Sequence, residues 1–167
     1  MTEPGLEDLT RAFPLAEMVL GRATLIPVRT LATAESCTGG LLAAALTAAP
    51  GSSAAYLGGV VTYANSLKAV ELGVSTQILE LHGAVSPEVA EAMARGVRER
   101  FRSALGISTT GIAGPGGTGA KPPGLIYLAV ASEGESTIRR LDHDRGRHGN
   151  RVYAVRAALE LLLAALQ

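Results

Sequence analysis

Short apolar runs separated by turn-forming residues dominate this chain and predict alternating strands and helices. Runs rich in β-branched and other apolar residues, bounded by glycine, proline or polar residues, are typical of strands. The last two such runs flank Glu133-Gly134-Glu135, which indicates a hairpin. The predicted strands are residues 28–34, 56–64, 106–110, 125–132 and 137–142.

Helix signals lie between and around these runs. Apolar residues recur every four positions from Val89 to Phe101, which predicts a helix with one buried face. Ser86 followed by Pro87 is a typical helix start, with serine as the cap and proline in the first turn. The predicted helices are residues 15–22, 39–48, 87–102 and 149–166.

The order of these elements predicts an α/β fold. A chain that alternates strands and helices and then adds a hairpin favours a three-layer sandwich, with a mostly parallel sheet and one antiparallel strand. Neither internal repeats nor linkers interrupt the pattern. We therefore expect a flexible segment at residues 1–14 and a single domain at residues 15–167.

Composition narrows the classes of function. The 167 residues contain 15 basic and 15 acidic side chains, so no overall charge favours nucleic acid or an anionic membrane. A single cysteine fits a reducing compartment, the acidic N-terminal stretch does not resemble a signal peptide, and no apolar run is long enough for a membrane helix. We expect a cytoplasmic protein that binds neither nucleic acid nor membrane.

The turn after the first predicted strand carries candidate chemistry. Residues 33–40, TAESCTGG, place Ser36 between a strand and an Ala/Leu-rich helix, where unpaired N–H groups at the helix N-terminus favour negative charge. Thr38, Gly39 and Gly40 are candidate oxyanion donors. The same pattern is equally typical of a helix cap, in which Ser36 or Thr38 satisfies backbone amides.

Two further segments end at the same predicted edge of the sheet, where ligands bind in open α/β folds. Tyr63 and Lys68 lie at or just beyond the end of the second strand. A glycine-rich loop at residues 111–124 follows the third strand, but it lacks the ending of a phosphate-binding P-loop. A flexible hairpin connection would have the same composition.

Read together, four blocks resemble one known family. They are residues 33–40, residues 59–68 (GVVTYANSLK), residues 83–86 (GAVS) and residues 110–118 (TGIAGPGGT). In this order and spacing they are similar to the CinA C-terminal-domain family, the nicotinamide mononucleotide (NMN) deamidases often called PncC. The resemblance covers residue 15 to the C-terminus, and in length the chain resembles the stand-alone form.

The resemblance implies an amidohydrolase of pyridine nucleotide salvage that converts NMN and water into nicotinic acid mononucleotide and ammonia. It also implies a three-layer α/β/α sandwich with a five-stranded mixed sheet, a homodimer, and no metal or other cofactor. His82, His143 and His148 lack a usual metal-ligand spacing.

For this reaction Ser36 is the candidate nucleophile and Lys68 the candidate base, provided that burial lowers the lysine pKa. Tyr63 is a candidate to relay the proton or to orient Lys68. Cys37 is a competing nucleophile, although a small buried cysteine is equally typical of a core. Without the resemblance, Lys68 would be interpreted as an ordinary surface lysine.

Candidate substrate-binding residues surround this group. Glu35 is expected to favour the cationic ring or to hold Lys68, and a structural salt bridge is a comparable alternative. Arg145 matches the family arginine before the last helix, but His143 replaces a glycine there, with Arg147 too near and Arg151 too far to be the second arginine. The full set is Glu35, Thr38, Gly39, Gly40, Thr110, Gly111, Gly114, Gly116, Gly117, Thr118 and Arg145.

Two other functions remain open. One is a catalytically silent nucleotide-binding module associated with competence or DNA damage, in which Ser36 and Lys68 perform no chemistry. The other is a serine amidase that acts on a different small amide.

Overall fold

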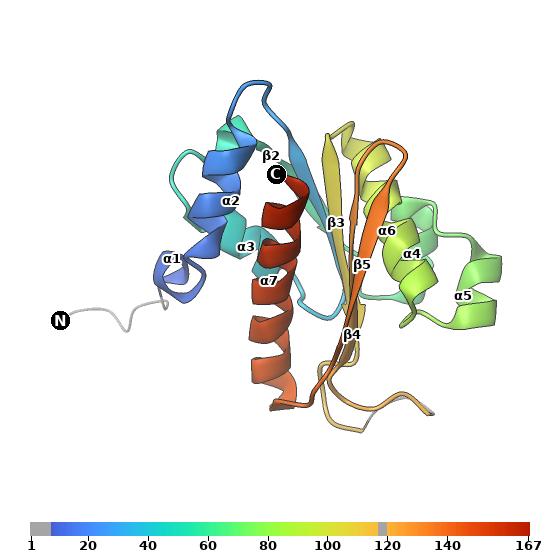
Figure 1. Cartoon of the computed structure of the whole chain (residues 1–167). Coiled ribbons are helices and arrows are strands. Elements are labelled where there is room, and N and C mark those ends of the chain that lie inside the picture. Colours follow the sequence, from blue (N-terminus) through green and yellow to red (C-terminus); the bar gives the residue numbers. More distant parts are fainter. Residues whose placement is uncertain (1–7, 117–119) are drawn as a thin grey trace.

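A five-stranded sheet forms the middle layer of the computed structural model, which describes residues 8–116 and 120–167 (Figure 1). The strand order is β2-β1-β3-β4-β5. β1 runs parallel to β2 and β3, whereas β4 is antiparallel to both β3 and β5. The predicted mixed sheet, with one strand opposed to the other four, is confirmed. The strands are β1 (Leu31–Glu35), β2 (Tyr56–Val61), β3 (Leu105–Gly111), β4 (Leu125–Ala131) and β5 (Ser136–Asp142).

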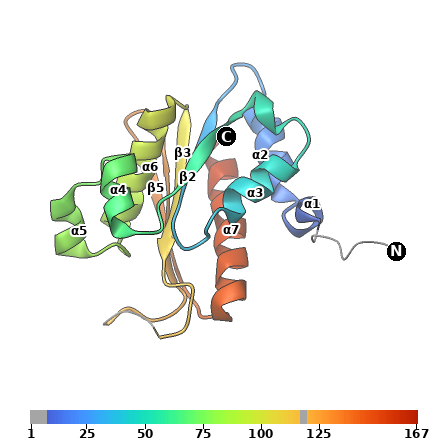
Figure 2. The ribbon, with the colours of Figure 1, turned by 180° about the vertical axis from the view of Figure 1, so that it is seen from behind.

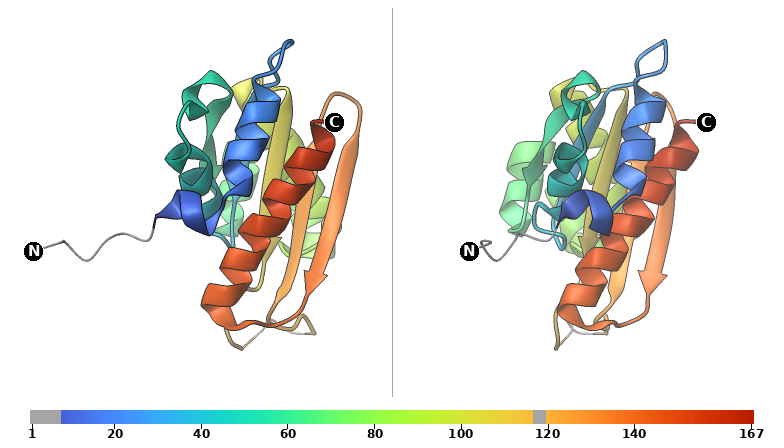
Figure 3. Two further views of the ribbon diagram at one scale, coloured as in Figure 1. Left: turned by 60° about the vertical axis from the view of Figure 1, so that its left-hand side comes forward. Right: turned by 90° about the vertical axis from the view of Figure 1, so that its left-hand side faces the viewer.

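Helices cover both faces of this sheet, as the predicted three-layer sandwich requires (Figures 1 and 2). α1, α2, α3 and α7 lie on one face, and α4, α5 and α6 lie on the other. α2 and α7 run side by side across their face (Figure 3). The helices are α1 (Leu9–Ala12), α2 (Leu15–Ala23), α3 (Leu41–Ala48), α4 (Asn65–Leu72), α5 (Thr76–His82), α6 (Pro87–Phe101) and α7 (Gly146–Ala165), with a 3-10 turn at Ser52–Ala54.

The structure differs from the predicted elements near both termini. Where we expected a flexible segment up to residue 14, α1 forms and Phe13 is buried in the core, while residues 1–7 lie outside the described residues. α7 begins at Gly146 rather than at Gly149. Among the described helices, none combines the length and the hydropathy that a membrane-spanning helix requires.

The two faces of the sheet carry side chains of different size. Alternate strand residues such as Leu31, Ile107 and Leu128 contribute large aliphatic groups to the core under α2, α3 and α7. On the opposite face, Ala129 and Ala131 pack against alanines of α6. Because both surfaces at this second contact are small, α6 lies close to the sheet.

Gly106 and Ser108 mark the tightest contact between β3 and α6. A Cβ atom at Gly106 would overlap the carbonyl oxygen of Ala94. The hydroxyl of Ser108 donates to the carbonyl oxygen of Ala90 over 2.6 Å. At Gly106 the helix backbone therefore packs directly on the strand backbone, and at Ser108 only a hydroxyl group separates them.

The carboxylate of Glu35, at the end of β1, organises the turn into α3. It is fully buried and accepts hydrogen bonds from the Thr38 hydroxyl (2.6 Å) and the amides of Gly40 (3.0 Å), Leu42 (3.0 Å) and Ala43 (2.8 Å). A negative charge at this position satisfies free amides at the helix N-terminus and interacts favourably with the helix dipole. The strand end and the helix start are thus joined through one side chain.

We expect Gly106→Ala to lower the free energy of unfolding by about 2–3 kcal/mol, because the added methyl group forces α6 away from the sheet. Gly21→Ala is the matched control, since no atom lies within 4 Å of the added Cβ in α2. Helix propensity predicts that this control gains about 0.5–1 kcal/mol. Urea denaturation measures both changes. If Gly106→Ala were as stable as the wild type, α6 could move away from the sheet without a loss of unfolding free energy.

Glu35→Gln should cost about 3 kcal/mol of unfolding free energy, because the amide NH2 faces backbone N–H donors and leaves them without an acceptor. Glu99→Gln, on the exposed face of α6, should change stability by less than about 0.5 kcal/mol. Thermal and urea unfolding of the two variants provide the comparison. Equal stability of both variants would contradict a structural role for the Glu35 carboxylate.

Candidate active site

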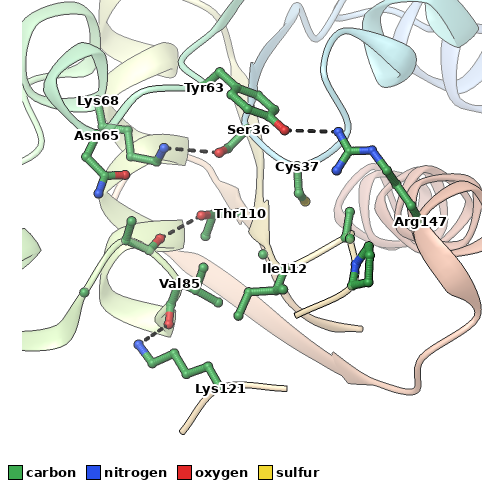
Figure 4. Close-up of a pocket in the computed structure, with 16 residues that line it drawn as sticks. Ser36, Cys37, Tyr63, Asn65, Lys68, Val85, Thr110, Ile112, Lys121 and Arg147 are labelled. Carbon is green, nitrogen blue, oxygen red and sulfur yellow. Dashed lines mark hydrogen bonds between the residues drawn. The ribbon is translucent and has the colours of Figure 1, made fainter. Parts of the chain in front are cut away.

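A pocket of about 540 Å³ opens where the parallel strands end, and it falls in the size range of small-molecule sites. Segments converge on it from the ends of β1, β2 and β3, from the α5–α6 connection, from the residues before β4, and from the first turn of α7 (Figure 4). Its lining consists of Ser36, Cys37, Tyr63, Asn65, Lys68, residues 83–85, residues 110–115, Lys121 and Arg147.

Ser36 and Lys68 meet in this pocket, as the sequence predicts. The Nζ atom of Lys68 lies 3.1 Å from the Oγ atom of Ser36 (Figure 4). Lys68 also donates to the carbonyl oxygen of Thr62 over 2.8 Å. Ser36 is held in turn by its own amide, which donates to the carbonyl oxygen of Thr109 in β3. Both members of the pair are therefore fixed by backbone atoms.

Burial of Lys68 shifts its protonation equilibrium toward the neutral amine. The side chain is only 1% exposed, and burial lowers the pKa of its ammonium group below the usual 10.5. α4 places Lys68 one turn after Asn65, so the side chain extends back toward the end of β2. A lysine with a lowered pKa and an adjacent hydroxyl has the arrangement of a general base and its nucleophile.

Cys37 is a poor competitor for the role of nucleophile. Its side chain is 6% exposed, and burial raises the pKa of its thiol to about 12. Because the thiolate is the nucleophilic form, this cysteine stays in its unreactive state near neutral pH. The geometry favours Ser36.

Four predicted substrate-binding residues lie beneath the pocket lining and build the turn instead. Glu35 binds the amides of α3, and the hydroxyl of Thr38 donates to Glu35. The amide of Gly39 donates to the Ser36 carbonyl oxygen, and the amide of Gly40 donates to Glu35. These contacts correct the expectation that Glu35 holds Lys68 and that Thr38, Gly39 and Gly40 offer donors to a ligand. Glu35 and Thr38 are fully buried.

Tyr63 and Arg147 form the rim of the pocket, and Arg147 replaces Arg145 as its arginine. The Tyr63 hydroxyl accepts a hydrogen bond of 3.1 Å from Arg147, and the tyrosine ring is 58% exposed (Figure 4). The guanidinium of Arg145 instead stacks on Tyr153, 3.8 Å from the ring centre. Arg145 is therefore absent from the pocket lining, which corrects its placement as a substrate-binding residue. Within the described residues Tyr63 makes no hydrogen bond to Lys68.

Arg151 and Asn150 connect the start of α7 to the loops of the site. Arg151 lies one helical turn after Arg147 and donates twice to the Thr38 carbonyl oxygen, over 3.1 and 2.8 Å. The side chain of Asn150 donates to the carbonyl oxygen of Ala113 and accepts from the amide of Arg145. Arg147 and Arg151 therefore connect the first turns of α7 to Tyr63 and to the turn after β1.

The glycine-rich loop is placed only in part. Thr110, Gly111 and Gly114 line the pocket as predicted, and the Thr110 hydroxyl donates to the Ala84 carbonyl oxygen over 2.7 Å. Gly116 is exposed and does not line it. The remaining two predicted residues of this loop, Gly117 and Thr118, lie outside the described residues.

Sequence reasoning did not assign Lys121, Asn65 or residues 83–85 to the site. Residues 83–85 and Asn65 stand inside the blocks that carry the family resemblance, so a signal was present. Lys121 follows the glycine-rich loop and donates to the carbonyl oxygens of His82 and Val85. In the part of the chain that the structure describes, no three His, Cys, Asp or Glu side chains form a metal-binding group.

Comparisons with known proteins identify the family of this chain. The family model described as the CinA C-terminal domain matches residues 15–166. A CinA-like protein of Gloeobacter violaceus is 53% identical over 161 residues, covering 95% of this chain and 37% of that protein. A putative competence-damage inducible protein of Moorella thermoacetica is 48% identical over 152 residues, covering 90% of this chain and 37% of that protein. The chain thus spans little more than a third of these curated relatives.

Solved structures show the same fold over nearly the whole chain. The competence/damage inducible protein CihA from Agrobacterium tumefaciens is 43% identical with a TM-score of 0.89, and the match covers 98% of both chains. A competence-damaged protein (CinA) superfamily protein from Escherichia coli is 36% identical with a TM-score of 0.88, and the match covers 96% of this chain and 94% of that one. This chain therefore belongs to the CinA C-terminal domain family.

Proposed function

We propose that this domain hydrolyses the carboxamide of NMN to give nicotinic acid mononucleotide and ammonia, with Ser36 as nucleophile and Lys68 as general base. The observation that carries the proposal is the 3.1 Å contact between Lys68 Nζ and Ser36 Oγ at the wall of an accessible pocket. Amide hydrolysis needs a nucleophile, a base, oxyanion donors and a proton for the leaving amine. The pocket offers candidates for each.

In the first step the Ser36 hydroxyl gives its proton to the neutral Lys68 amine while Oγ attacks the amide carbon. A carbon–oxygen bond forms, and the carbonyl oxygen becomes an oxyanion. The Cys37 amide directly follows the nucleophile, and within the described residues it has no acceptor on another residue. An amide in this position is a common oxyanion donor.

In the second step the carbon–nitrogen bond breaks and Lys68 returns its proton to the departing ammonia. This leaves an ester between Ser36 and the pyridine carboxyl group. Lys68, neutral again, then accepts a proton from a water molecule whose oxygen attacks the ester carbon. The ester bond breaks, Oγ regains a proton from Lys68, and the acid leaves.

The charge of the pocket supports an anionic substrate. Two cationic side chains, Lys121 and Arg147, line it beside the neutral Lys68 of the proposed dyad, and no carboxylate residue does so within the described residues. NMN combines a phosphate with a cationic ring, and an exposed aromatic face such as that of Tyr63 attracts cations. Asn65 and Thr110 add polar groups that can orient a ribose.

Removal of either dyad member should abolish ammonia release from NMN. We expect Lys68→Met, which keeps the length of the side chain, to lower kcat by roughly 10²–10⁴-fold, and Ser36→Ala to lower it at least as much. The exposed Ser53→Ala is the matched control and should keep wild-type turnover. A glutamate-dehydrogenase-coupled ammonia assay measures all four proteins.

The same assay separates the other functions. Wild-type protein that binds NMN but releases no ammonia would favour the silent nucleotide-binding module. Release from nicotinamide, glutamine or asparagine but not from NMN would favour an amidase with another substrate. Full activity of Ser36→Ala would overturn the nucleophile assignment under any substrate.

Turnover should rise with pH toward a plateau. Only the neutral form of Lys68 accepts the Ser36 proton, and burial places its pKa below 10.5, so protonation at lower pH removes the base. In a plot of kcat/KM against pH, the rising part of the curve should therefore have its midpoint below pH 10.5. A rate that stays constant or increases as the pH falls through the whole accessible range would contradict Lys68 as the base.

A further inference from the structure

Both lysines of this chain line the same pocket. The sequence contains 13 arginines but only two lysines, Lys68 and Lys121, so lysine is not the residue that supplies its general surface charge. Lys68 serves the dyad by its contact with Ser36. Lys121 lies at the other end of the pocket, beyond Val85, and has no part in the proposed proton transfers (Figure 4).

The ammonium group of Lys121 is held by backbone oxygens. It donates to the carbonyl oxygens of His82 over 2.8 Å and of Val85 over 2.7 Å. Gly83 lies between these two residues, and a Cβ atom there would come within 3.1 Å of Lys121 Nζ. The absence of a side chain at Gly83 therefore lets the ammonium group rest directly against the chain.

Two features leave Lys121 ready for an anion. An ammonium group has three N–H donors, and the two carbonyl bonds use two of them. Lys121 is half-buried, and within the described residues no carboxylate lies within salt-bridge distance of it. Its charge is thus partly removed from water and lacks a counterion.

Arg147 is less suited to the same task. Its side chain is exposed, so that water screens its charge, and one of its donors already binds the Tyr63 hydroxyl. Lys121 by contrast is fixed by two contacts before any ligand arrives. A preorganised donor loses less side-chain entropy on binding.

We propose that Lys121 is the residue that makes the pocket specific for a phosphate monoester. A phosphate oxygen accepts a hydrogen bond from the third N–H of the Lys121 ammonium group, at the end of the pocket away from Ser36. The inference rests on the proposed function, since it places the phosphate at one end while the carboxamide meets Ser36 at the other. The charge of Lys121 would then be the reason why the pocket binds a nucleotide more tightly than the corresponding nucleoside. Lys121 does not act on the reacting atoms.

The test measures binding without catalysis. In a Ser36→Ala background, isothermal titration calorimetry compares NMN with nicotinamide riboside, which lacks only the phosphate. Lys121→Met should weaken NMN binding at least about tenfold, as expected for a lost charged hydrogen bond, and nicotinamide riboside binding less than about twofold. Arg140→Met, an exposed residue outside the pocket, removes the same charge and should affect both ligands less than about twofold.

Other outcomes overturn the inference. Equal losses for both ligands would show that Lys121 only holds the pocket wall in place, and an unchanged NMN affinity would show that it does not bind phosphate. A Ser36→Ala protein that binds NMN no more tightly than nicotinamide riboside would also exclude a phosphate site. Thermal melting of each variant confirms that the fold is retained.

The binding test and the ammonia assay distinguish failure of the phosphate site from failure of the proposed reaction. Ammonia release by wild type together with unchanged NMN affinity in Lys121→Met would leave the function standing and reject the phosphate site. Loss of phosphate selectivity in Lys121→Met, with no ammonia release by wild type, would retain the phosphate site and reject the reaction.

Discussion

The buried Glu35 carboxylate is the interaction on which the rest of the site depends. A charge removed from water is costly unless hydrogen bonds replace its solvation, and here four donors from the following turn and from α3 do so. Because all four donors follow Glu35 closely in sequence, the strand can end and the helix can begin in only one relative position. Ser36, the next residue, is thereby directed into the pocket.

The start of α7 stabilises the same turn from the opposite end of the chain. Arg151 binds the Thr38 carbonyl oxygen, and one helical turn earlier Arg147 contacts Tyr63 at the rim. Asn150 adds a contact to the loop after β3 through the Ala113 carbonyl oxygen. Residues from one helical turn therefore reach three separate segments of the pocket, so the placement of α7 on the sheet and the shape of the site are coupled.

Sequence patterns within a few residues predicted much of this arrangement. The parts that were not predicted depend on contacts between residues that are farther apart in the sequence. The strand, turn and helix around Ser36 follow from residue types within a few positions, and so do the hairpin and the cap at Ser86, whose hydroxyl accepts from the Val89 amide. The role of Glu35 was missed because its donors lie up to eight residues onward and meet it only once α3 has formed. Arg145 was preferred to Arg147 because it matched the family arginine before the last helix, and a sequence match does not show which side chain reaches the pocket.

The support of Lys68 by the Thr62 carbonyl oxygen has an evolutionary consequence. The position of an amine that is held by another side chain changes when that side chain is replaced, but the position of an amine held by the main chain depends only on the path of the main chain. The length of the segment from residue 62 to residue 68 should therefore be more constrained than the identity of those of its side chains that do not line the pocket. In diverging copies of this domain, a single insertion there would separate Lys68 from Ser36 while both side chains remained in the sequence.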